Sequence, residues 1–72
     1  MTMQEWIVAY AEALHVPTPT ENEIEHLLDL AGVAAHASER TAAPLSCWLA
    51  AKAGLSAEQA LAVAQHLADG DT

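Results

Sequence analysis

Residues 20–40 read TENEIEHLLDLAGVAAHASER, and this stretch decides the fold. It opens with Thr20 and, three residues later, Glu23, the pattern of a capping box in which each side chain binds the other residue's backbone N–H. Acidic residues in this first turn also suit the positive end of the helix dipole. After this first turn, a set of residues at helical spacing shares one face, and their side chains become smaller toward the C-terminal end: Ile24, Leu27, Leu28, Ala31, Ala35 and Ser38. The stretch predicts a long helix over about residues 21–40, with Arg40 favoured near its C-terminal end.

The sequence before this helix predicts a shorter one over about residues 3–14. Thr2 and Glu5 form a second capping box at its start. Pro17 and Pro19 lie too close together for a helix to continue through them. The apolar stripe of this helix would consist of Trp6, Ile7, Tyr10, Ala13 and Leu14.

The sequence after the long helix predicts two more helices. Pro44 is well placed as a first helical residue, and Gly54 as a C-terminal cap, so we expect a third helix over about residues 45–53. A third capping box, Ser56–Gln59, opens a fourth helix over about residues 57–69.

The four segments together predict an all-α protein, because no stretch alternates apolar and polar residues as a strand would. Short connections favour a compact antiparallel four-helix arrangement, with residues 1–72 as a single domain. Much of the 53% apolar content is alanine, which buries little area, so we expect a thin core that includes Trp6 and Trp48. Self-association or docking onto a larger protein would then complete that core.

Charge and composition exclude several classes of function. Two basic residues, Arg40 and Lys52, stand against ten acidic ones, for a net charge of -8. Nucleic-acid binding needs several cations to displace counterions from phosphates, and anionic membranes repel such a chain. The lone Cys47 offers no internal disulfide. Neither a signal peptide nor a membrane-spanning apolar run is recognisable, so we expect a cytoplasmic protein.

The sequence offers little for catalysis, metals or cofactors. No two of the four histidines lie three or four residues apart, the spacing that would aim both at one metal ion from a helix. Cys47 would need a histidine base, and only the fold could bring His36 to it. A small, buried and inert cysteine beside Trp48 is the simpler interpretation. We expect no catalytic residue, no metal and no cofactor.

The most suggestive surface is a stripe on the long helix. It consists of four residues spaced by four, three and four positions: Asp29, Val33, His36 and Arg40. It would lie on the side of the helix away from the predicted core face, with Gly32 beside it allowing close approach of a backbone or ligand. The stripe can bind an anion or a partner carboxylate, or it can be an ordinary solvated face. Together with the turn to the third helix, the candidate binding residues are Asp29, Gly32, Val33, His36, Arg40 and Pro44.

The stretch LLDLAGVAAHASERTAAPL, residues 27–45, resembles a bacterial domain of unknown function. The block from His36 to Leu45 carries most of the likeness. Members of that family occur alone and as C-terminal extensions of molybdenum cofactor guanylyltransferases, the MobA-like nucleotidyltransferases. The resemblance implies an accessory role near molybdenum cofactor maturation, and any action on such an enzyme would be in trans. It brings no established catalytic residues.

Three hypotheses follow. The leading one is a non-catalytic accessory domain that binds a protein, either a molybdenum cofactor nucleotidyltransferase or a molybdoenzyme. The second is a sensor or carrier that binds an anionic pterin or nucleotide through His36 and Arg40. The third is an enzyme that depends on Cys47. We expect the protein not to be an enzyme.

Overall fold

A computed structural model describes residues 1–70 of the chain as four α-helices. They are α1 (Met3–Leu14), α2 (Glu21–Ala37), α3 (Ala42–Lys52) and α4 (Ala57–Ala68). No strand occurs within these seventy residues, so the all-α prediction is confirmed. Residues 71 and 72, which the predicted domain includes, lie outside the described part.

All three predicted capping boxes form. At the start of α2, the Glu23 N–H donates to the Thr20 hydroxyl at 3.1 Å, and the Thr20 N–H donates to the Glu23 carboxylate at 2.7 Å. The same reciprocal bonds open α1 and α4, between Thr2 and Glu5 and between Ser56 and Gln59. Each box satisfies two backbone donors that a helix start would otherwise leave without a partner. These local bonds explain why the three starts match the prediction.

The connection between α2 and α3 differs from the prediction. α2 ends at Ala37 instead of near Arg40, and α3 begins at Ala42 instead of Leu45. Residues 38–41 form the turn, so Arg40 lies outside the helix on which it was expected. Pro44 is the third residue of α3 and not the first. The N–H groups of a first helical turn have no acceptor within the helix, so proline, which lacks an N–H, fits at any of these positions.

The core forms where α3 and α4 pack against α2. Leu30, Ala60 and Leu61 are buried, and a ring of partly buried residues surrounds them: Leu27, Val33, Cys47, Ala50 and Ala64. Leu28, expected in the core, is instead 59% exposed, whereas Leu30 is 3% exposed. Most positions from 27 to 35 are apolar, so either of two faces of α2 could have formed the core. The packing of α3 and α4 determines which face is buried.

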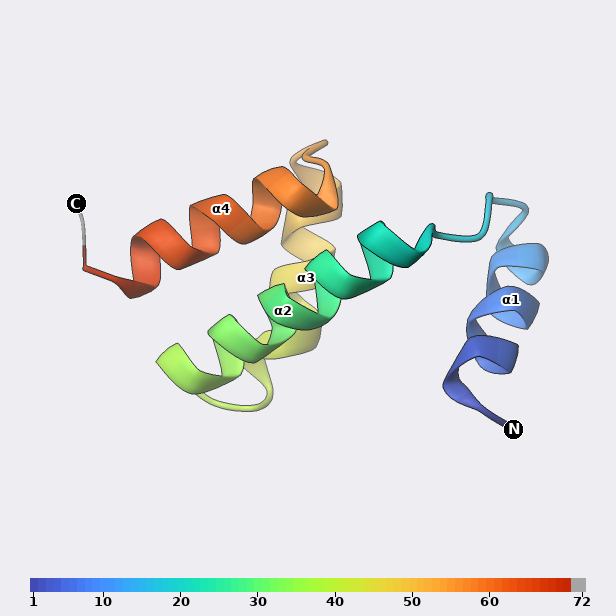
Figure 1. Cartoon of the computed structure of the whole chain (residues 1–72), viewed down its shortest axis with the longest axis horizontal. Helices are drawn as coiled ribbons and strands as arrows, with labels where there is room; N and C mark the ends of the chain where they lie inside the picture. Colours follow the sequence, from blue (N-terminus) through green and yellow to red (C-terminus); the bar gives the residue numbers. More distant parts are fainter. Residues whose placement is uncertain (71–72) are drawn as a thin grey trace.

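α1 stands apart from this core, at the N-terminal end of α2 (Figure 1). Figure 1 also shows α3 running back against the direction of α2, while α4 returns roughly along it. Within residues 1–70, the extensive helix–helix packing involves α2 with α3 and α2 with α4, and none of comparable extent involves α1. The molecule is accordingly long, with extents of 39 × 23 × 18 Å.

Neither tryptophan lies in the core, contrary to the prediction. Trp6 is 56% exposed and stacks on Tyr10 with ring centroids 5.7 Å apart. Trp48 is 60% exposed, and the Lys52 Nζ lies 5.2 Å from its ring centroid. Burial of so large a ring needs an opposing surface, and α1 has no helix packed extensively against it among the described residues.

The position of Leu30 predicts that Leu30→Ala destabilises the protein far more than Leu28→Ala. Removing a buried leucine side chain costs about 2–5 kcal/mol, because transfer energy is lost and a cavity remains. Leu28 is a matched control on the same helix, and its replacement should cost less than about 1 kcal/mol. Urea denaturation followed by far-UV circular dichroism measures both. Equal losses would contradict this assignment of the core.

The capping box of α1 predicts a pKa effect. Hydrogen bonds from Thr2, chiefly from its backbone N–H and then from its hydroxyl, hold the pKa of Glu5 below its ordinary value. Such a bond stabilises α1 above the unfolded pKa of Glu5, and the contribution is lost as the pH falls through the lower folded value. We expect Thr2→Ala to raise the pKa of Glu5 part of the way back, as measured by carboxyl NMR titration. Thr20→Ala, at the other threonine box, should leave it unchanged.

Candidate functional site

Four of the six predicted binding residues line one hollow on the surface of α2. Asp29, Gly32, Val33 and His36 lie along one side of the helix, as their spacing predicted. Leu28 joins them, and Gln65 of α4 forms the opposite edge. The hollow has a volume of about 410 Å³ and is shallow.

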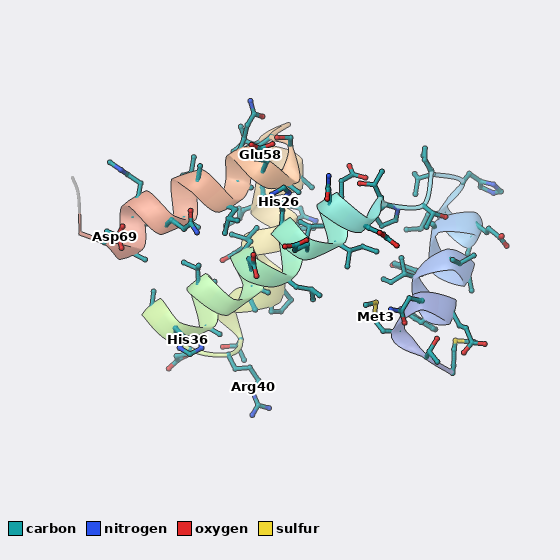
Figure 2. All side chains as sticks on the ribbon, in the orientation of Figure 1. Met3, His26, His36, Arg40, Glu58 and Asp69 are labelled. Atoms are coloured by element: carbon teal, nitrogen blue, oxygen red, sulfur yellow. The ribbon has the colours of Figure 1, made fainter. Side chains whose placement is uncertain are left out.

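Arg40 and Pro44 do not line this hollow. Figure 2 shows the Arg40 side chain extending away from the fold from the turn after α2, while His36 lies at the end of that helix. Both side chains are exposed. The structure therefore does not bring His36 and Arg40 together over the hollow, and the acidic residue Asp29 is one of its lining residues. A pterin or nucleotide anion finds little support in this arrangement.

Gly32 leaves room in the hollow. A Cβ added at this position would meet no atom within 4 Å, apart from its neighbours in the chain and the backbone of its own helix. The open space is therefore not a place where α3 or α4 already packs. The expectation that another molecule approaches the α2 backbone closely at this point stays a prediction.

Val33 has two roles. It packs against the buried cluster around Leu30, and it also lines the hollow. Its presence in the candidate stripe was predicted from spacing, but its contact with the core was not. A substitution at Val33 would disturb both, so this residue is a poor probe of the surface.

A family model described as a domain of unknown function (DUF6457) matches residues 1–71. The chain belongs to the DUF6457 family. Neither the comparison with curated proteins nor that with solved structures gave a match. The DUF6457 match spans α1 as well as the three packed helices, so the separate helix is part of the family's domain and not an appendage.

Cys47 of this DUF6457 domain lies in the second turn of α3, because the helix starts earlier than predicted. It is half-buried, and burial raises the pKa of its thiol. A raised pKa reduces the thiolate fraction that a nucleophile needs. The small hollow beside Cys47 is lined in part by Glu23 and Ser56, and no histidine is among its lining residues in the described chain. This hollow therefore supplies no histidine base for the cysteine-enzyme hypothesis.

The histidines are dispersed over the DUF6457 fold. His15 takes a left-handed conformation with φ of 59° at the end of α1, and His36 and His66 lie in the last turns of α2 and α4. His26 is half-buried on α2. Over residues 1–70, no group of three or more His, Cys, Asp or Glu side chains is placed to hold a metal ion. None of the four helices described is long and apolar enough to cross a membrane.

Two residues of the hollow were missed by sequence reasoning. Leu28 was assigned to the core because its neighbours are apolar at helical spacing, and the sequence contains no signal that favours Leu30 over it. Gln65 comes from α4 and reaches the hollow only through tertiary packing. No local motif could have linked it to Asp29 or His36.

The space above Gly32 predicts that Gly32→Ala stabilises the domain. Alanine in a helix interior is favoured over glycine by roughly 0.5–1 kcal/mol, and here its methyl group meets no obstacle. Gly54→Ala is the matched control. Because Gly54 has a φ of +76°, a left-handed conformation that alanine adopts poorly, its replacement should destabilise the domain. Thermal denaturation distinguishes the two, and a loss of stability at position 32 would show that the hollow is not free.

Proposed function

We propose that this DUF6457 domain is a non-catalytic protein-interaction module that contacts its partner through the hollow on α2 and the adjoining turn to α3. The observation that carries the proposal is the exposure of its apolar side chains. Within residues 1–70, fourteen large hydrophobic residues are exposed, whereas only two of the four buried hydrophobic residues are larger than alanine. Soluble monomers rarely leave apolar surface on this scale without a partner for it.

The hollow has the composition of a protein contact. Leu28 supplies an exposed apolar anchor, and Asp29, His36 and Gln65 supply polar groups around it. Such a mixture of an apolar centre and a polar edge is typical of interfaces between proteins. The hollow is also shallow, which suits a protruding side chain or helix better than an enclosed small substrate.

Charge limits the kind of partner. The chain carries a net charge of -8, and α2 alone contains four acidic residues. A partner surface with basic residues around an apolar patch would be attracted to this helix over a long range. The domain would therefore recognise a basic and apolar protein face.

A molybdenum cofactor guanylyltransferase is the partner that we favour, with a molybdoenzyme as the other member of the same class. The resemblance described above supports this choice, since similar domains accompany such nucleotidyltransferases. The role would be accessory to cofactor maturation, with the chemistry performed by the partner.

The proposal predicts that Leu28→Ala weakens binding to purified molybdenum cofactor guanylyltransferase by about tenfold, the effect of losing one interface anchor. Isothermal titration calorimetry with the complete chain measures this. Val8→Ala is the matched control, because Val8 is a similarly exposed aliphatic residue on α1, away from the hollow. Its replacement should leave affinity within about twofold of the original.

Two outcomes would overturn the proposal at different levels. If the unaltered chain binds neither the guanylyltransferase nor a molybdoenzyme, the choice of partner is wrong. If it binds and Leu28→Ala leaves the affinity unchanged, the α2 hollow is not the contact. The stability measurement on Leu28→Ala described above separates loss of contact from loss of folding.

A further inference from the structure

The molecular surface is larger than a monomer of this mass should expose. A compact monomer of 7.6 kDa is expected to expose roughly 4,300 Å². This chain exposes 5602 Å². The excess of roughly 1,300 Å² per chain is enough for a stable dimer, because standard interfaces bury about 1,200–2,000 Å² in total from both partners.

Much of the unpaired apolar surface lies on α1. Trp6, Tyr10 and Leu14 recur at intervals of four residues, so they share one side of the helix, and all three are about half exposed. An isolated helix of only 12 residues is marginally stable in water. The capping box at Thr2 helps α1 to form, but a docking surface for its apolar side would stabilise it much more.

A second unpaired apolar surface is the groove between α3 and α4. It has a volume of about 260 Å³, and its floor includes Leu30 and Ala60 of the core. Leu49, Val63 and Leu67 form its walls and are each more than half exposed. Apart from Ser46, the residues that line it in the described chain are apolar.

Charge favours this groove over α2 as the docking surface for α1. α1 contains two acidic residues and no lysine or arginine, and α2 contains four acidic residues that would repel it. α3 contains no acidic residue and ends with Lys52. The two basic residues of the chain, Arg40 and Lys52, lie just before α3 and at its end. The α3 side of the groove is therefore the least repulsive apolar surface for an acidic helix.

We propose that α1 is an exchange arm. In a dimer, the Trp6–Tyr10–Leu14 side of α1 from each copy packs into the α3–α4 groove of the other copy. The connection through residues 15–20, with its two prolines, holds α1 away from its own core, and a second copy can accept it at little cost (Figure 1). The α1 stripe and the walls of this groove are separate from the α2 hollow of the proposed function, so either proposal can fail without the other.

Sedimentation equilibrium of the complete chain tests the exchange with three variants. Tyr10→Glu places a charge on the arm, and Val63→Asp places one in the groove. Each should weaken dimerisation by about tenfold or more. Val8→Asp is the matched control, because Val8 faces the opposite side of α1 from Tyr10. It should dimerise like the unaltered chain. Far-UV circular dichroism checks that each variant is folded. All three substituted positions are exposed, so the core should stay intact.

A mixing experiment distinguishes arm exchange from other modes of association. Tyr10→Glu retains an intact groove, and Val63→Asp retains an intact arm, so an equimolar mixture can form one complete exchange contact. We expect heterodimers in the mixture at concentrations where each variant alone is monomeric. An unaltered chain that sediments as a monomer would overturn the proposal. This holds also if Trp6 is shielded from solvent in that monomer, because α1 would then occupy the groove of its own copy. Dimers that survive Tyr10→Glu, or a mixture that stays monomeric, would also overturn it.

Discussion

The contact of Leu30 with Ala60 and Leu61 holds the described fold together. Leu30 is the most deeply buried large side chain in residues 1–70, and the small methyl group of Ala60 lets α4 come close to α2 at that point. Once Leu30 faces inward, the helical period dictates the direction of every other side chain on α2. Leu28, Asp29 and His36 then border a surface hollow. The position of the candidate site is thus a consequence of one packing contact.

The features predicted correctly from the sequence are those determined by neighbours a few residues away. A capping box joins residues three apart, so Thr20 and Glu23 determine the start of α2 independently of the tertiary packing. The end of α2 has no such signal. Residues 37, 42 and 43 are alanines, which are compatible with either helix, and Pro44 tolerates several positions in a first turn. The exact turn, and with it the position of Arg40, depends on how α3 packs.

The candidate site was predictable to the same extent. Asp29, Gly32 and His36 share a side of α2 because spacing within a helix determines it, and the structure places them together. The pairing of His36 with Arg40 was lost when the helix ended earlier than the apolar pattern suggested. The tryptophans show the opposite limit. A large apolar ring is usually buried, but burial requires a facing surface, and a chain rich in alanine and short in large core residues supplies few. Trp6 and Trp48 therefore remain exposed within a single copy.

The net charge and the exposed apolar side chains act in opposite directions on the association of this chain with other molecules. A net charge of -8 opposes random self-association of a surface this apolar. The opposition is uneven, because the acidic residues are dense on α2, sparse on α4 and absent from the sequence of α3. The acidic and apolar helix α1 would be repelled least by α3, which has no acidic residue. A basic protein would be attracted most strongly to α2, where the acidic residues are most numerous. If both proposals hold, the same charge distribution would direct a second copy of the chain to the α3–α4 groove and a basic partner to the α2 hollow, so the two contacts would not compete.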